Sequence, residues 1–160
     1  MYEIAIIDYG INNLFSVKRA CDILGVKSVI TSDLDVIASS KSAILPGVGA
    51  FPYAMGNLKK LNLDKSIYEF VKSGKPFMGI CLGMQLLMES SIEFEKVDGL
   101  GLIKGTTSKF EYQKIHNESY PVPQIGWNKI HKGSNNWKDT ILKKNLDDDF
   151  MYFVHSYYVM

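Results

Sequence analysis

The chain of 160 residues contains only two cysteines and carries almost no net charge. Two cysteines in different contexts do not indicate a disulfide framework, and no metal-ligand spacing is present, so we expect a reduced, cytoplasmic protein without metal or cofactor. Because 18 Lys and Arg stand against 17 Asp and Glu, the charge predicts no surface for nucleic acid. The apolar runs are shorter than a membrane span, and we expect no secretory leader.

The first half of the chain alternates short apolar runs with helical patterns, which favours an α/β fold with a mostly parallel central sheet and helices on both faces. The predicted strands of this sheet are 4–8, 28–31, 43–45 and 75–80, and the last of these is expected to be buried on both faces. The predicted helices run up to residue 24 and over about 64–72 and 82–89. A smaller, more antiparallel part is predicted from strands at 99–103, 108–112, 124–130 and 150–159.

A thiol stands between the predicted strand 75–80 and the helix that follows it. Gly79 and Gly83 lie two residues before and after Cys81, which is the Gly-x-nucleophile-x-Gly pattern of a strand that turns sharply into a helix. The helix start favours the thiolate, the reactive form of cysteine. The pattern predicts that Cys81 is a nucleophile and that the backbone N–H of Leu82 helps to hold an oxyanion.

The alternative interpretation of Cys81 is a small buried residue with a structural role. The flanking glycines, with a strand before and a helix after, favour the nucleophile over this alternative. Cys21 is different, because it shares one face of a helical pattern with Leu14, Val17 and Leu24. We therefore expect Cys21 in the core.

A glycine-rich turn, 46–51, follows the predicted strand 43–45. Its main-chain N–H groups are candidates for completing an oxyanion hole, although an ordinary strand-to-loop turn explains these residues equally well. A nucleophilic thiol also needs a general base, most often a histidine. His155, in an apolar strand, is the best candidate by sequence context, whereas the polar surroundings of His116 and His131 predict solvated side chains.

Five segments in the same order resemble one known family. The chain is similar to the glutaminase subunits of imidazole glycerol phosphate synthase, which are class I, triad-type glutamine amidotransferases, and the resemblance covers nearly all of it. The segments that carry this resemblance are 8–17, 46–51, 79–87, 126–128 and 152–157.

The resemblance implies that Cys81 attacks the side-chain amide of glutamine, forms a glutamyl thioester and releases ammonia, and that water then frees glutamate. It also implies that the turn after residue 46 is an oxyanion strand whose peptide must reorient before it can donate. The implied oxyanion residues are Gly47, Val48, Gly49 and Leu82. The implied glutamine-binding residues are Gln85, Glu93, Ser156 and Tyr157, and the implied partner-interface residues are Trp127 and Asn128.

The implied partner is a cyclase subunit, a (β/α)8 barrel that forms a heterodimer with this chain. It would receive ammonia through an internal channel and add it to a phosphoribosyl nucleotide intermediate. The expected products are imidazole glycerol phosphate and an aminoimidazole carboxamide ribotide, in histidine biosynthesis.

Three departures from the family bear on this expectation. The family's catalytic histidine belongs to a later His-Pro-Glu motif, which these residues lack, so we expect His155 to be a core or partner-contacting residue. We therefore expect 1–160 to be a single amidotransferase domain that is incomplete at its C-terminus and hydrolyses glutamine negligibly alone. Asn12 and Gln124 replace the family's usual Gly and His.

The departures leave other functions open. One is a related amidotransferase that supplies ammonia for amidating a surface-polysaccharide sugar. Another is a catalytically silent binding module. A cysteine peptidase or thiol-stress protein is a further alternative, but segments 46–51 and 126–128 weigh against it because peptidase chemistry requires neither.

Overall fold

The structure, a computed structural model, describes residues 2–11, 13–110, 114–115, 118–119, 121–133 and 137–160. Three residues named in the predictions from sequence lie outside these described residues: Asn12, Tyr112 and His116. The chain divides into two compact units, one of residues 1–109 with 159–160 and one of residues 110–158. A single domain over 1–160 stays a prediction, and each unit is described by itself.

A parallel four-stranded sheet forms the centre of the first unit, in the order β2-β1-β3-β4. Its strands are β1 (Ile4–Ile7), β2 (Ser28–Thr31), β3 (Ser42–Leu45) and β4 (Phe77–Gly79). Ala5, Ile6 and Ile7 of the inner strand β1 are fully buried. The predicted parallel sheet is confirmed. Met78 is 42% exposed, so the prediction that the fourth strand is buried on both faces is wrong, because β4 is an edge strand.

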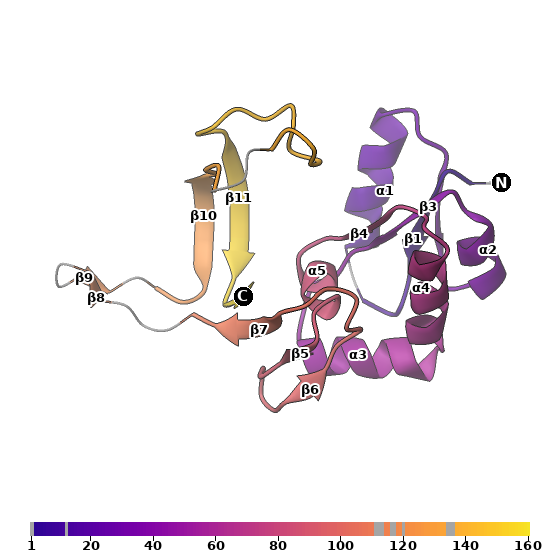
Figure 1. Cartoon of the computed structure of the whole chain (residues 1–160), viewed down its shortest axis with the longest axis horizontal. Coiled ribbons are helices and arrows are strands. Elements are labelled where there is room, and N and C mark those ends of the chain that lie inside the picture. The colour runs from indigo at the N-terminus through magenta and orange to yellow at the C-terminus, as the bar shows by residue number, and fades with distance from the viewer. Residues whose placement is uncertain (1, 12, 111–113, 116–117, 120, 134–136) are drawn as a thin grey trace. The chain divides into compact units, whose positions relative to one another are not determined.

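Helices connect these strands and cover both faces of the sheet (Figure 1). The chain crosses the sheet in one direction from β1 to β2 and in the opposite direction from β2 to β3 and β4. Right-handed crossovers therefore place α1 on one face of the sheet and the later helices on the other. The helices are α1 (Leu14–Ile23), α2 (Leu34–Ser39), α3 (Phe51–Lys60), α4 (Leu63–Lys72) and α5 (Leu82–Leu86).

The structure contains two helices, α2 and α3, that were not predicted. In α2 the Asp33 carboxylate caps the helix by accepting from the N–H groups of Asp35 and Val36. In α3, Pro52 and Gly56 obscure the helical pattern. Its buried residues nevertheless follow helical spacing, and this signal was in the sequence: Phe51, Ala54, Met55 and Leu58.

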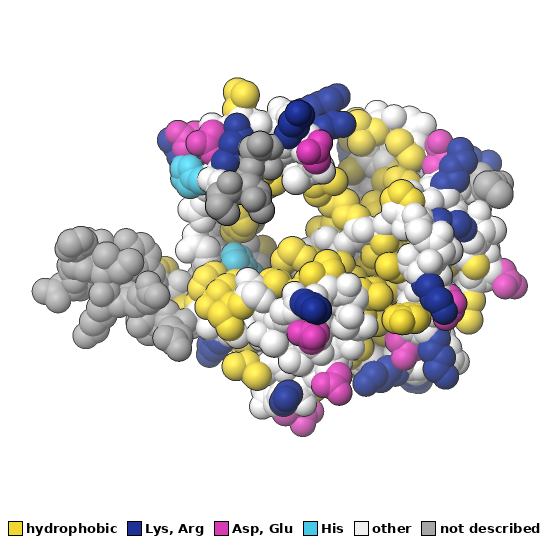
Figure 2. All heavy atoms as spheres, viewed as in Figure 1, with side chains coloured by type: hydrophobic (Ala, Val, Ile, Leu, Met, Phe, Trp, Pro, Cys, Tyr) yellow, Lys and Arg dark blue, Asp and Glu magenta, His cyan; other side chains and the backbone are white. Residues whose placement is uncertain are grey.

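Cys21 is buried in α1, as predicted, whereas Leu24, which shares its face in the helical pattern, is 78% exposed. The reason is that α1 ends at Ile23 and the chain turns at Gly25, which has φ 69°, so the side chain of Leu24 leaves the buried face. Apolar side chains also reach the surface elsewhere (Figure 2).

The predicted strand 99–103 is a loop. Its backbone N–H groups donate to carbonyls at the end of α5 instead of pairing with a strand: Leu100 donates to Leu86, Gly101 to Met88 and Leu102 to Leu87. These bonds satisfy carbonyls that a helix end leaves unpaired. They also explain why α5 ends at Leu86, before the predicted end at Glu89.

A second sheet has the order β12-β7-β5-β6. Its strands are β5 (Ser90–Ser91), β6 (Val97–Asp98), β7 (Thr106–Lys109) and β12 (Tyr157–Val159), of which the last residue belongs to the first unit. The backbones of Thr106 and Met160 exchange two hydrogen bonds. The predicted strand 150–159 is therefore two strands, separated at Ser156.

In the second unit, β10 (Gln124–Lys129) and β11 (Phe150–His155) form an antiparallel pair, as predicted. The register runs from Gln124 opposite His155 to Lys129 opposite Phe150. Two short strands, β8 (Lys114–Ile115) and β9 (Glu118–Ser119), pair with each other. Among the described residues, no helix is both long and apolar enough to cross a membrane.

Candidate active site

The backbone of Cys81 has φ 54° and ψ −116° at the junction of β4 and α5. A non-glycine residue in this region costs roughly 1–3 kcal/mol, so the surrounding structure must hold it there. Its side chain is a free, exposed thiol. The predicted sharp turn from strand to helix is therefore present, and the residue at its apex is the exposed one of the two cysteines.

The two flanking glycines let the turn pack against its neighbours. A Cβ on Gly79 would lie 2.6 Å from the Cα of Met84, and one on Gly83 would collide with the carbonyl oxygen of Leu45 at the end of β3. Any side chain at either position would push the turn away from the sheet. Gly79 and Gly83 thus account for the strained conformation of Cys81.

The glycine-rich turn after β3 lies against this elbow. An ideal Cβ on Gly47 would lie 3.2 Å from the Cβ of Leu82 and 3.3 Å from the backbone nitrogen of Gly83. Gly49 has φ 104°, which only glycine adopts readily, and Val48 between them is 42% exposed. The structure therefore brings Gly47 against Leu82, two of the four residues predicted for the oxyanion hole, and the other two, Val48 and Gly49, follow Gly47 in the chain.

Tyr9 belongs to the same neighbourhood, although no role was predicted for it. Its side chain is fully buried, and its hydroxyl donates a 2.7 Å hydrogen bond to the carbonyl oxygen of Pro46. Burial raises the pKa of this hydroxyl above its ordinary value of 10.0, and the nearby Cys81 charge adds to the rise. Its position after β1, among the carboxyl ends of the parallel strands, was the available signal.

Two residues predicted to bind glutamine lie in this unit. The carboxylate of Glu93 accepts a 2.8 Å hydrogen bond from the backbone N–H of Phe51, at the start of α3. Gln85 follows Cys81 by one turn of α5, and the side chain of Gln85 is only 8% exposed. The backbone N–H of Gln85 donates to the carbonyl of Cys81. Both side chains therefore lie beside segments that contain predicted catalytic groups.

The other predicted site residues lie in the second unit. Trp127 and Asn128 are exposed on β10, and Ser156 and Tyr157 follow β11. His155 is half-buried, and its Nδ1 lies 2.8 Å from the carbonyl oxygen of Tyr157. The ring of His155 also packs beside those of Phe110 and Phe153, at centroid distances of 5.0 and 5.8 Å. These contacts describe a packed histidine.

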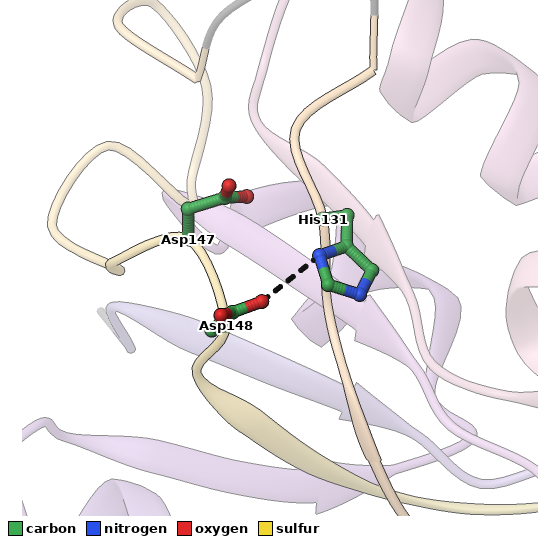
Figure 3. A group of neighbouring side chains, drawn as sticks. All are labelled: His131, Asp147 and Asp148. Atoms are coloured by element: carbon green, nitrogen blue, oxygen red, sulfur yellow. Dashed lines mark ion pairs between the residues drawn. The ribbon is translucent and has the colours of Figure 1, made fainter.

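A further titratable group lies at the end of the β10–β11 pair (Figure 3). Nδ1 of His131 is 3.1 Å from the Asp148 carboxylate, which also pairs with Lys129, and Asp147 accepts from the backbone N–H of Lys132. The side chains of His131, Asp147 and Asp148 are exposed, and His131 is solvated as predicted. Each acidic group thus has a partner that closes the loop between the strands.

Comparison with known proteins agrees with this geometry. A CobB/CobQ-like glutamine amidotransferase domain matches residues 4–137. The imidazole glycerol phosphate synthase subunit HisH of Shouchella clausii strain KSM-K16 is 44% identical over 98% of this chain and 73% of its own length. The HisH subunit of Listeria monocytogenes serotype 4a strain HCC23 is 43% identical over 97% of this chain and 71% of its own length.

Structural comparison supports the fold alone. A crystal structure of a glutamine amidotransferase superposes with a TM-score of 0.58 at 16% identity, over 67% of this chain and 56% of the other. The chain thus spans little more than half of that structure. The sequence relatives do not favour the sugar-amidating alternative. On the identity and coverage of the HisH subunits, the chain belongs to the glutamine amidotransferase family of imidazole glycerol phosphate synthase HisH subunits.

Proposed function

We propose that this chain is the glutaminase subunit of an imidazole glycerol phosphate synthase, which converts L-glutamine into glutamate and ammonia through a thioester on Cys81. The observation that carries the proposal is the backbone of Cys81, held at φ 54° between two glycines that have no room for a side chain. This arrangement presents an exposed thiol beside main-chain N–H groups. The combination suits covalent attack on an amide.

The reaction follows from these groups. Sγ of Cys81 bonds to the side-chain carbonyl carbon of glutamine, and the carbonyl oxygen becomes an oxyanion. We assign its stabilisation to the N–H groups of Leu82 and of the turn 47–49. The C–N bond then breaks, and nitrogen leaves as ammonia with the proton of the thiol. Water adds to the thioester, which restores the thiol and frees glutamate.

Recognition of glutamine is assigned to two side chains of the first unit. The Glu93 carboxylate suits the α-ammonium of the substrate, and Gln85 lies one turn beyond the nucleophile. A glutamine-binding role for Ser156 and Tyr157 stays a prediction of the family resemblance. We assign none of the described histidines as the base that takes the thiol proton. Sequencing of the coding region beyond the Met160 codon, to look for a His-Pro-Glu motif, tests this assignment.

The proposed partner is a cyclase subunit with a (β/α)8 barrel, which receives the ammonia and acts in histidine biosynthesis. Trp127 is 67% exposed on one face of the β10–β11 pair, with its ring 5.6 Å from that of Tyr152 opposite. Ile125 and Val154 are exposed on the same face. Asn128 lies on the other face. An apolar face of this kind, centred on a tryptophan, suits a protein partner.

A glutamine-analogue electrophile tests the proposal directly. We expect it to alkylate Cys81 and not Cys21, and we expect millimolar glutamine to slow the labelling, with the modified residue identified by mass spectrometry. The structure provides the control, because Cys21 is buried and Cys81 is exposed. A Cys81→Ser variant should take no label. Labelling that glutamine does not slow would contradict a glutamine site.

The proposal extends to the location of the protein. Both cysteines are free thiols, which suits a reducing, cytoplasmic compartment.

A further inference from the structure

Tyr9 is a buried tyrosine whose hydroxyl points at the turn assigned to the oxyanion hole. The hydroxyl donates 2.7 Å to the Pro46 carbonyl oxygen, and a Cβ on Gly47 would collide with it. The hydroxyl therefore lies directly against the first peptide of the turn. Its own backbone is also tied down, because Nδ2 of Asn57 on α3 donates 2.9 Å to the Tyr9 carbonyl.

The hydrogen bond from Tyr9 sets the orientation of one peptide plane. A trans peptide is planar, with its C=O and N–H pointing in opposite directions. While the Pro46 carbonyl accepts from Tyr9, the N–H of Gly47 must therefore point away from Tyr9. Rotation within the turn is confined to the peptides after this one.

The other end of the turn is held as well. The Glu93 carboxylate binds the backbone N–H of Phe51, which begins α3. Residues 47–50 thus form a short span between two anchors, and Gly49 within it has φ 104°. A span of this kind can change the direction of one peptide without moving β3 or α3.

The hydroxyl is not suited to act as a base toward Cys81. Its proton is used in the bond to Pro46, and burial raises the pKa of Tyr9, with the Cys81 charge adding to the rise. The group therefore remains a protonated donor near neutral pH.

We propose that Tyr9 is a positioning residue for the oxyanion turn: by holding the Pro46 carbonyl, it restricts reorientation to the peptides of residues 47–50 and so orders the N–H donors for the tetrahedral intermediate. The inference deepens the proposed function and rests on it. Tyr9 contacts neither glutamine nor the reacting atoms in this role. Removal of its hydroxyl should therefore reduce the stabilisation of the transition state and leave the affinity for glutamine and the reactivity of the Cys81 thiol unchanged.

The test uses the full-length protein with its cyclase partner and compares wild type, Tyr9→Phe and Tyr68→Phe. The phenylalanine at position 9 keeps the buried ring and removes the donor, while Tyr68 is an exposed tyrosine on α4. For Tyr9→Phe we expect kcat for glutamine hydrolysis to fall about 10-fold, a smaller loss than that of an oxyanion donor itself. KM should change less than about twofold.

Two further measurements separate positioning from general damage. The inhibition constant of the aldehyde analogue of glutamine, which forms a tetrahedral adduct with the thiol, should rise about 10-fold in Tyr9→Phe. The rate of Cys81 alkylation by iodoacetamide should match wild type. Tyr68→Phe should match wild type in every assay.

Two results would overturn the inference: an unchanged kcat and aldehyde affinity in Tyr9→Phe, or a fall in kcat, glutamine affinity and alkylation rate together. Failure of the proposed function is distinct, because it appears in the wild-type protein as no glutamine turnover.

Discussion

The carboxylate of Glu93 accepts a 2.8 Å hydrogen bond from the backbone N–H of Phe51, a residue 42 positions earlier in the chain. One oxygen of a proposed substrate-binding residue thereby holds the start of α3, directly after the oxyanion turn. The other oxygen remains for the α-ammonium of glutamine in our assignment. Glu93 would thus connect the place where substrate binds with the place where the oxyanion forms.

A Glu93→Gln substitution separates these two roles, because the amide keeps an oxygen acceptor for Phe51 and loses the negative charge. We expect KM for glutamine to rise at least about 10-fold, since hydrogen bonds to charged groups contribute roughly 1.5–3 kcal/mol. Steady-state kinetics of the full-length protein with its partner measure this. Glu95→Gln, at an exposed position two residues away, is the matched control and should leave KM unchanged. Equal KM values in both variants would remove Glu93 from the glutamine site.

A methyl group at Gly83 should destabilise the first unit. Because its Cβ would collide with the Leu45 carbonyl oxygen, we expect Gly83→Ala to lower the free energy of unfolding by about 3 kcal/mol. Gly56→Ala on α3 is the control, since its Cβ meets nothing within 4 Å and should stabilise the helix by roughly 0.5–1 kcal/mol. Urea denaturation measures both. A neutral Gly83→Ala would mean that the elbow and β3 pack less closely than described.

The raised pKa of Tyr9 predicts a loss of stability in alkali. Burial is the larger cause and the Cys81 charge the smaller, and both favour the protonated hydroxyl in the folded state. This contribution is fully present below the ordinary pKa of 10.0 and is lost progressively as the pH rises above it. Wild type should therefore lose more stability than Tyr9→Phe between pH 9 and pH 11, as measured by urea denaturation. Parallel curves for the two proteins would exclude the shift.

Truncation of Trp127 should weaken binding of the cyclase partner. The side chain is 67% exposed at the centre of an apolar strand face, and a tryptophan in such a place commonly contributes about 2 kcal/mol or more to binding. We expect Trp127→Ala to raise the Kd at least about 30-fold by calorimetry, as 1.4 kcal/mol is tenfold. Trp137→Ala, outside the strand pair, should bind as wild type does. A larger rise in Kd for Trp137→Ala than for Trp127→Ala would contradict an interface on β10.

The local sequence pattern was sufficient to predict those parts of the site whose residues are close together in the chain. Gly79, Cys81 and Gly83 are two residues apart, so their spacing alone predicted the sharp turn that the backbone angles of Cys81 display. The parallel sheet followed from apolar runs that alternate with helices. The helix α3 was missed because Pro52 and Gly56 outweighed a regular set of buried residues.

Tertiary structure decided what depends on residues far apart in sequence. The run at 99–103 has the composition of a strand, but its N–H groups satisfy the carbonyls at the end of α5, and nothing in its own residues specifies that choice. Tyr9 reaches Pro46 because the parallel strands β1 and β3 bring their carboxyl ends to one edge of the sheet. Glu93, which follows β5 of the second sheet, reaches Phe51 through the packing of the unit. The sequence by itself therefore determined the sharp turn and the place of Cys81 at its apex, since these rest on local backbone geometry. Only the tertiary structure decided which side chains hold the oxyanion turn, because hydrogen bonds across 37 and 42 residues depend on the packing of the whole unit.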